Sequence, residues 1–312
     1  MSIKKILLFS FILIFIPFVI VNLFIKNEEI RFNYISNKYV RVYRENKKIV
    51  EKVPLEEYVY GVVSSEMPAS FDNEALKAQA VASRTYVIYE MENNKDKDFD
   101  VYDSVNSQVY RSCEELKEYW GDKYLEYSNK IKKAVIDTEG QYLVYEDKVI
   151  LSLFFSESTG YTENSEEVFN EKLPYLRSVE SKWDLDSPNY NSEKEFKKKD
   201  FYNMLGISYS DTLNITDIEK TSSGRIKKLK INNVEFSGRD IRTKLELRST
   251  FFTFYEESDK ILIKTKGYGH GVGMSQYGAN KMALSGYKYQ DILKYYYTGV
   301  EIKKINNSSI KL

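Results

Sequence analysis

Pro68 divides two stretches of helical periodicity and leaves an acidic residue, Glu66, at their junction. A proline cannot continue a preceding helix and disfavours the α region for the residue before it, so a helix over 53–65 must end near Glu66. Apolar residues of that helix recur on one face, and Glu66 takes the next position on it. Burial raises the pKa of a carboxyl group, as a general acid near neutral pH requires. The pattern predicts a catalytic acid; a cap or solvated carboxylate is the alternative.

A second helix is predicted after the break, with Asp72 as its N-cap and Glu74 in its first turn. Several alanines keep this helix slim, so another backbone can approach it closely. Lys77 and Arg84 lie two turns apart on nearly the same side of it, roughly 10 Å along the axis. We expect these cations to frame a cleft beside Glu66, with a solvated helix face as the alternative.

An apolar run over residues 6–25 is long enough to cross the hydrocarbon core of a bilayer, and Lys4 and Lys5 precede it. Lysines on that side favour a cytoplasmic N-terminus, which places the rest of the chain outside. A cleaved signal peptide is the alternative, but no A-x-A-like site follows the run. We therefore predict a cell-membrane protein with a single anchor within 1–29 and an extracytoplasmic C-terminal domain.

Charge and cysteine content exclude several classes of function. The 46 basic and 46 acidic side chains balance, which gives no charge argument for nucleic acid as a partner. The single cysteine, Cys113, rules out an intramolecular disulfide, and with the single histidine, His270, it cannot build the common zinc sites. A serine hydrolase would have to use His270 without the G-x-S-x-G motif. No metal or other cofactor is predicted.

The remaining pattern predicts an α+β fold, in which a mixed helical and antiparallel-strand catalytic domain carries a small inserted α+β subdomain. The expected parts are 1–29 as N-terminus and anchor, 30–191 and 260–312 as the two halves of the catalytic domain, and 192–259 as the insertion. Hairpins are expected over 37–53 and 140–156, helices over 124–138, 194–205, 239–247, 274–283 and 290–297, a strand pair over 217–231 and a strand over 260–266.

Two loops carry further candidate binding residues. The loop SESTGYTEN, residues 156–164, follows an apolar strand, so its hydroxyl groups emerge at a strand end, where a rigid scaffold often holds a binding site. An ordinary turn is the alternative. His270 lies among four glycines in GYGHGVG, which permits positive φ and close backbone approach. It is a candidate to hydrogen-bond a substrate, or a structural histidine of a tight loop.

The runs EMPASF, at 66–71, and EALKAQAVASRTY, at 74–86, closely resemble the signature of the stage II sporulation protein D family, which are peptidoglycan lytic transglycosylases of endospore-forming bacteria. The triplet QVY at 108–110, the segment LPYLRSVESKWDLDSP at 173–188 and the run GYGHGVGMSQYGANKMALSGY at 267–287 are also similar to that family. The resemblance covers most of the chain beyond the anchor and is weakest in the insertion.

The resemblance implies one catalytic residue, Glu66. In its protonated form Glu66 would protonate the oxygen that links N-acetylmuramic acid (MurNAc) to N-acetylglucosamine (GlcNAc), then take a proton from the sugar's own 6-hydroxyl as a 1,6-anhydro ring closes. Together with the loops above, it gives these candidate substrate-binding residues: Lys77, Arg84, Gln108, Tyr110, Ser156, Ser158, Tyr161 and His270. Some members bind zinc through a Cys and a His near this Glu, whereas here the nearby thiol is Cys113 and no His precedes His270.

The implied setting is engulfment during sporulation. The substrate would be peptidoglycan glycan strands stripped of stem peptides, the location the septal or engulfing membrane, and the partners stage II sporulation proteins P and M. Two alternatives remain: a noncatalytic wall-binding module similar to the amidase enhancers, and a scaffold for a membrane complex.

Overall fold

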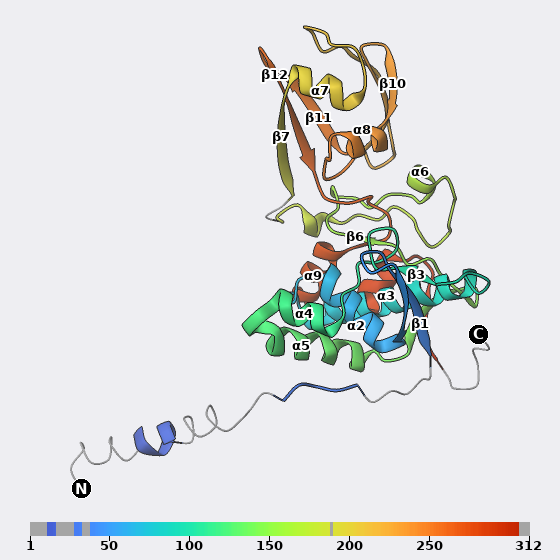
Figure 1. Ribbon diagram of the computed structural model, residues 1–312, viewed down its shortest axis with the longest axis vertical. Helices are drawn as coiled ribbons and strands as arrows, with labels where there is room; N and C mark the ends of the chain where they lie inside the picture. Colours follow the sequence, from blue (N-terminus) through green and yellow to red (C-terminus); the bar gives the residue numbers. More distant parts are fainter. Residues whose placement is uncertain (1–10, 17–27, 33–37, 188–189, 306–312) are drawn as a thin grey trace.

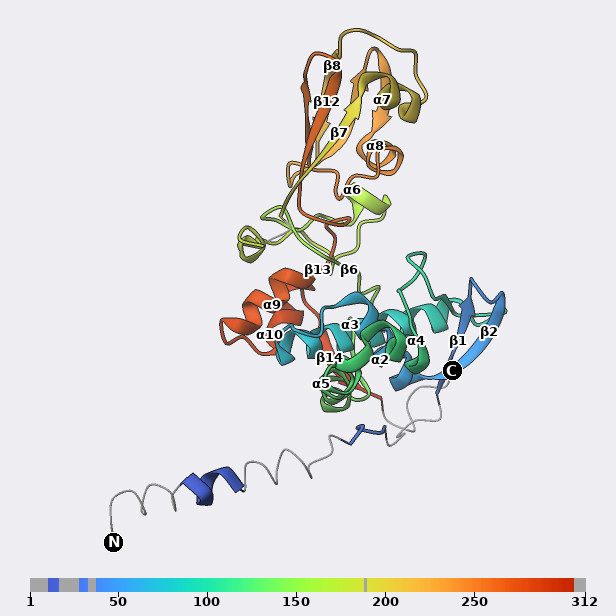
Figure 2. The same ribbon diagram turned by 60° about the vertical axis from the view of Figure 1, so that its left-hand side comes forward.

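The computed structural model describes residues 11–16, 28–32, 38–187 and 190–305. A helical body and a subdomain of strands with two helices make up most of it (Figure 1). The strand pair β6 and β13 and a layer of irregular chain lie between these two parts in both views (Figures 1 and 2). Each part has its own cluster of buried apolar residues. The fold is a mixed α+β fold, as the sequence predicts.

The first helix ends, and the second begins, where the sequence predicts. Strands β1 (Tyr39–Arg44) and β2 (Ile49–Pro54) form the expected hairpin, and α2 (Leu55–Glu66) follows directly. Met67 is extended, with φ −124° and ψ 135°, which is the conformation that a following proline favours. The Asp72 side chain then caps α3 (Asn73–Asn93). The acid at the end of α2 is thus fixed by local chemistry.

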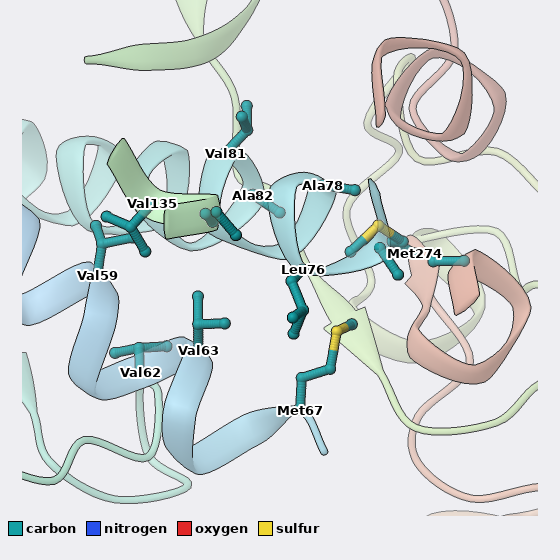
Figure 3. Packing of buried hydrophobic residues seen from close by; sticks show 14 of the residues in the cluster. Val59, Val62, Val63, Met67, Leu76, Ala78, Val81, Ala82, Val135 and Met274 are labelled. Carbon is teal, nitrogen blue, oxygen red and sulfur yellow. The ribbon is translucent and has the colours of Figure 1, made fainter. Parts of the chain in front are cut away.

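Helix α3 is the centre of the helical body. It packs against α2, α5 (Tyr124–Asp137), α9 (Gln276–Leu284) and α10 (Tyr289–Tyr296). Figure 3 shows valines of α2 facing Leu76 and Ala82 of α3. The alanines of α3 are fully buried, so their small side chains allow the close approach of neighbouring backbones that the sequence predicts. Helix α4 (Cys113–Trp120) and the short helix η1 (Gly121–Lys123) precede α5.

Three small sheets complete this part. Strand β3 (Val101–Tyr102) pairs parallel to β1, and β14 (Glu301–Lys304) pairs with β4 (Gln141–Tyr145), which also pairs with β5 (Lys148–Val149). The expected hairpin over 140–156 is therefore shorter than predicted. Its second arm leaves β4 after β5, and the buried Ser152 hydroxyl donates to the Ala82 carbonyl of α3. The chain then forms β6 (Phe154–Phe155), parallel to β13 (Met274–Ser275).

The subdomain contains two antiparallel three-stranded sheets. Their orders are β10-β9-β8 and β11-β12-β7. The strands are β7 (Asn191–Lys197), β8 (Ile215–Lys220), β9 (Ile226–Ile231), β10 (Val234–Ser237), β11 (Phe252–Glu256) and β12 (Lys260–Lys266). Helices α7 (Lys198–Leu205) and α8 (Gly238–Lys244) belong to the same subdomain (Figure 1). Its core includes Phe201, Leu229, Ile241 and Ile263.

One expected helix of the insertion needs correction. The predicted helix over 194–205 is a strand in its first part, because β7 pairs along its whole length with β12. The pairing of Asn191 with Lys266 brings the chain that enters the subdomain beside the chain that leaves it. Strand β12, which the sequence analysis assigns to the second half of the catalytic domain, belongs to the subdomain's sheet.

The predicted membrane anchor lies mostly outside the described residues. Residues 11–16 of the apolar run are helical. Within the described ranges, no helix combines the length and the apolar character that a membrane crossing needs.

Candidate active site

A cleft of about 1000 Å³ is lined by residues of the helical body, of the connecting loops and of the subdomain. The helical body contributes Glu66 and Gln108 to the lining, and the connecting loops contribute Ser156 and His270. The subdomain contributes Arg225 and Arg242. The structure thus brings together four of the residues that the sequence analysis selects. It adds cations from the insertion, where the sequence showed no site.

Glu66 lies at the last position of α2 and is partly buried. Its Oε1 accepts a hydrogen bond of 2.7 Å from the main-chain N–H of Val109. Burial raises the pKa of Glu66, while the Val109 N–H and the charge of Arg111 oppose that rise. The net effect is a raised pKa, so the protonated form of Glu66, which can donate a proton, persists to higher pH than in a solvated Glu side chain.

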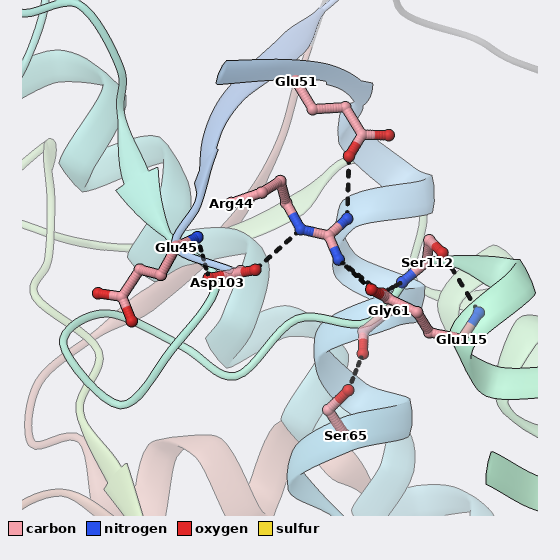
Figure 4. A network of polar contacts seen from close by, with 8 residues as sticks. All are labelled: Arg44, Glu45, Glu51, Gly61, Ser65, Asp103, Ser112 and Glu115. Carbon is pink, nitrogen blue, oxygen red and sulfur yellow. Dashed lines mark hydrogen bonds and ion pairs between the residues drawn. The ribbon is translucent and has the colours of Figure 1, made fainter. Parts of the chain in front are cut away.

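An ionic network around the buried Arg44 holds the loop that contains Val109. Arg44 contacts Asp103 at 2.8 Å before Val109 and Glu115 at 2.6 Å after it, and pairs with Glu51 at 2.9 Å (Figure 4). Gly61 of α2 makes room for this loop, because a Cβ there would lie 2.5 Å from the Arg111 carbonyl oxygen. The donor to Glu66 therefore rests on a tightly fixed segment.

Gln108 is 2% exposed and lies next to Val109 in the cleft wall. Its Oε1 accepts a hydrogen bond of 3.3 Å from the Tyr58 hydroxyl, and its Nε2 has no partner among the described residues. Tyr110, the other candidate from this loop, stacks on Tyr58 with ring centroids 5.3 Å apart and does not line the cleft. This part of the loop thus contributes Gln108 to the site and Tyr110 to the core.

His270 lines the cleft between two aromatic rings. Its ring centroid is 5.7 Å from that of Phe155 and 5.5 Å from that of Phe169. Nδ1 accepts a hydrogen bond of 3.1 Å from the Val272 N–H. Burial and nearby arginines lower the pKa of His270 to about 3, so the imidazole is neutral at pH 7 and carries its proton on Nε2.

The loop over 156–164 divides between the cleft and the interior. Ser156 lines the cleft, while Ser158 is fully buried and donates to the Asp184 carboxylate at 2.7 Å. Tyr161 is 51% exposed and does not line the cleft. Asp184, in the short helix η2 (Lys182–Asp184), also accepts from Ser275 at 2.6 Å, so this buried carboxylate ties the loop to β13.

Residues 43–145 match a family model described as "Stage II sporulation protein", and residues 114–273 match "Domain of unknown function (DUF8618)". A protein named stage II sporulation protein D from Bacillus amyloliquefaciens is 45% identical over 273 residues, which are 86% of this chain and 79% of that protein. The chain belongs to the stage II sporulation protein D family.

Two further relatives come from Bacillus subtilis (strain 168). Its stage II sporulation protein D is 45% identical over 270 residues, or 85% of this chain and 79% of that protein. Its amidase enhancer is 30% identical over 297 residues, or 78% of this chain and 40% of that protein. The range 43–145 that matches the family model contains Glu66 and Val109.

In this member of the stage II sporulation protein D family, Lys77 and Arg84 do not frame the cleft as expected. Arg84 is fully buried and contacts both carboxylate oxygens of Glu56, at 2.9 and 2.5 Å. Lys77 pairs with Glu74 at 3.2 Å and with Asp137 of α5 at 3.1 Å. The side of α3 that carries both cations faces acids of its neighbours, so they stabilise helix packing.

Cys113 and His270 are the residues of this chain available for a Cys and His zinc pair of the kind that the resemblance implies for some family members. Cys113 does not line the cleft, and His270 already accepts a main-chain hydrogen bond through Nδ1. In the described part of the chain, no group of three or more His, Cys, Asp or Glu side chains is arranged to hold a metal ion.

Sequence reasoning missed the arginines of the subdomain. Arg239 and Arg242 are three residues apart on α8, which is a visible signal for a shared helix face, and both line the cleft. Nothing in the sequence indicates that α8 turns this face toward Glu66, since the placement depends on sheet pairings across the insertion.

Proposed function

We propose that this chain is a membrane-anchored peptidoglycan lytic transglycosylase. It cleaves the MurNAc-GlcNAc linkage in glycan strands stripped of stem peptides and leaves 1,6-anhydro ends. The observation that carries the proposal is Glu66, a carboxyl group with a raised pKa in the wall of the cleft. Membership of the stage II sporulation protein D family supports the sporulation setting.

The other carboxyl groups of the cleft are engaged elsewhere. Glu163 is fully buried and its Oε2 accepts from the hydroxyls of Thr221 and Ser223, at 2.6 and 2.5 Å. Glu167 pairs with Lys227 at 3.2 Å. Hydrolytic glycosidases normally use two carboxyl groups, as acid and as base or nucleophile. A site with one free acid suits a reaction in which the same group acts twice.

The mechanism uses both oxygens of Glu66. Oε1 is held by the Val109 N–H, so Oε2 carries the proton toward the glycosidic oxygen. As the bond from C1 of MurNAc to that oxygen breaks, the proton passes to it and GlcNAc leaves with a 4-hydroxyl. The carboxylate then accepts the proton of the MurNAc 6-hydroxyl while O6 bonds to C1. The Val109 N–H stabilises the carboxylate between these steps, and no water is consumed.

The cellular setting is part of the same proposal. The apolar run over 6–25 anchors the chain in the septal or engulfing membrane with its C-terminal domain outside the cytoplasm. Stage II sporulation proteins P and M are the proposed partners. An amidase that removes stem peptides would supply the strands that this site cleaves.

A second function is a noncatalytic wall-binding module. The 30% identity to the Bacillus subtilis amidase enhancer favours it. In that role the cleft binds glycan but does not cleave it, and replacement of Glu66 leaves the function unchanged.

One experiment separates these functions. The purified chain and its Glu66→Gln variant are incubated with peptide-free glycan strands, and the products are identified by mass spectrometry. Products with 1,6-anhydro ends that disappear with the variant support the transglycosylase. New reducing ends indicate hydrolysis instead. Strands that bind but stay intact with the unchanged chain favour the wall-binding module.

A further inference from the structure

Three arginines of the subdomain form one wall of the cleft: Arg225, Arg239 and Arg242, here called the arginine wall. None of them forms an ion pair with a carboxylate within the described ranges, whereas the neighbouring Lys227 pairs with Glu167 and Glu219. Besides Glu66, four cations and two carboxylates line the cleft, which leaves a net charge of +2. A positive cleft attracts and orients anionic ligands.

Arg225 is the buried member of the wall. It is 1% exposed, and its Nη1 donates to the Gly269 carbonyl at 3.3 Å. Its Nε and Nη2 have no hydrogen-bond partner in the described part of the chain. Burial lowers the pKa of Arg225 to about 10, so the group remains charged at pH 7. A buried charge with unsatisfied donors costs folding free energy, and the charge of the nearby Glu163 offsets part of that cost.

Arg239 and Arg242 are the accessible members. They share a face of α8, and Arg239 is exposed while Arg242 is partly buried. The Nε of Arg242 donates to the Leu247 carbonyl at 3.3 Å, which fixes its orientation. Burial and the charge of Arg239 lower the pKa of Arg242, and the charge of Arg242 acts in the same direction on Arg225. Arg242 is therefore repelled by both other cations, while Glu163 offsets part of the charge of Arg225, and an anion bound at Arg239 and Arg242 relieves the repulsion.

The chemistry of the proposed substrate identifies that anion. Each MurNAc of a strand without stem peptides carries a free carboxylate on its lactyl ether. A stem peptide is attached through an amide at the same carbon, which removes this charge and adds bulk. Guanidinium groups bind carboxylates through paired, charge-assisted hydrogen bonds, so they distinguish the two forms directly.

We propose that the arginine wall binds the lactyl carboxylate of MurNAc and selects strands without stem peptides, an inference that rests on the proposed function. Arg239 and Arg242 contact the carboxylate. Arg225, whose nitrogen atoms are covered, acts behind them as a positioning residue that raises the local potential. Glu66 and the wall then face the same sugar strand from the helical body and from the subdomain.

The test measures binding by calorimetry with the full chain in detergent micelles, carrying Glu66→Gln so that strands stay intact. The probes are peptide-free strands and the same strands with every lactyl carboxylate converted to a methylamide. We expect the methylamide strands to bind about 10-fold or more weakly. The paired substitution Arg239→Gln and Arg242→Gln should weaken binding of the carboxylate strands by a similar factor and leave the methylamide strands unaffected.

Lys199→Gln with Lys220→Gln is the matched control, since both lysines are exposed in the same subdomain and neither lines the cleft. An equal loss in this control would mean nonspecific charge attraction and would overturn the proposal. Equal affinity for the two kinds of strand would overturn it without any variant. Inorganic phosphate and acetate are also tested as competitors of strand binding. If phosphate competes at a far lower concentration than acetate, the arginine wall binds a phosphate polymer and not the lactyl carboxylate. Arg239→Gln alone, at an exposed position, keeps the test valid if the paired variant does not fold.

The outcome is separable from that of the proposed function. Carboxylate-dependent binding without any cleavage by the unchanged chain would leave the arginine wall in place and refute the transglycosylase. Equal cleavage of carboxylate and methylamide strands by the unchanged chain would support the transglycosylase and refute the proposed role of the arginine wall.

Discussion

The main-chain N–H of Val109 donates a 2.7 Å hydrogen bond to the carboxyl group of Glu66. Two opposing effects meet in this contact. Burial favours the protonated acid, and the N–H favours the carboxylate; burial is the larger effect, so the pKa of Glu66 is raised. A group that gives a proton and then takes one back must exist both as the protonated acid and as the carboxylate. The Val109 N–H stabilises the carboxylate form by its hydrogen bond.

Replacement of Glu66 by Gln should abolish cleavage with little change in structure. The amide oxygen can still accept the Val109 N–H, but the side chain has no proton to transfer. We expect the rate of strand cleavage to fall by about 10² to 10⁴-fold, as for loss of a general acid. Product formation followed by chromatography measures it, with circular dichroism to verify the fold. If the variant keeps about a tenth or more of the original cleavage rate, another group and not Glu66 is the catalytic acid.

Cleavage should also depend on pH through the same group. Because the acid must be protonated, kcat/KM should fall as pH rises through the raised pKa of Glu66. The protonated form also stabilises the fold: that contribution is complete below the unfolded pKa and is lost as pH rises through the folded pKa. The stability of Glu66→Gln relative to the unchanged chain should therefore increase over that pH range. A constant difference between urea melts at several pH values would contradict the raised pKa.

The sequence predicts those parts of the fold that local chemistry decides. Pro68 and Asp72 end one helix and begin the next at the observed positions. The sequence predicts a helix where β7 forms, because the residues of β7 are largely charged and acquire their conformation from β12, which lies more than sixty residues further along the chain. Pairing over that distance leaves no local signal in the sequence.

The same limit applies to the site. Spacing placed Glu66 on an apolar face and the structure places it in the cleft wall. Spacing also showed that Lys77 and Arg84 share a side of α3, but not which neighbour covers that side. Glu56 of α2 and Asp137 of α5 do so. The arginine wall depends on how the whole subdomain is placed over the helical body, which no single segment encodes.

Loss of the Arg84 cation should destabilise the helical body strongly. Its partner Glu56 has a side chain only 7% exposed, so Arg84→Met leaves a buried carboxylate without its cation. Breaking such a pair costs about 3 to 5 kcal/mol. Urea unfolding measures it, and addition of Glu56→Gln should recover part of the loss because the stranded charge is removed. A double variant less stable than the single one would show that Glu56 is held by other groups.

Lys77→Met is the contrasting case on the same helix. Its partners Asp137 and Glu74 have side chains 36% and 17% exposed, so water reaches both carboxylates and hydrates them when the cation is lost. We expect a loss below about 1 kcal/mol in the free energy of unfolding. If glycan binding falls while this stability is kept, Lys77 contacts the substrate despite its place outside the cleft lining; unchanged binding assigns it to helix packing.

Gly273→Ala should displace the part of the cleft wall that β6 forms. Gly273 has φ +81°, and a Cβ there would lie 2.0 Å from the Leu153 carbonyl oxygen, which accepts hydrogen bonds from Met274 and Tyr297. Relief of that clash separates β6 from β13, and β6 carries residues of the cleft wall. Gly286→Ala is the matched control, since Gly286 has φ +95° with open space around it.

The control isolates the cost of the backbone conformation, about 1 to 2 kcal/mol for a residue with a Cβ at positive φ. Any further loss of stability in Gly273→Ala measures the clash with Leu153. We expect that excess, read from urea melts of both variants, to be accompanied by loss of glycan binding only in Gly273→Ala. Equal stability of the two variants would mean that β6 can move aside freely, and the close contact between Gly273 and Leu153 would then have no part in holding the cleft wall.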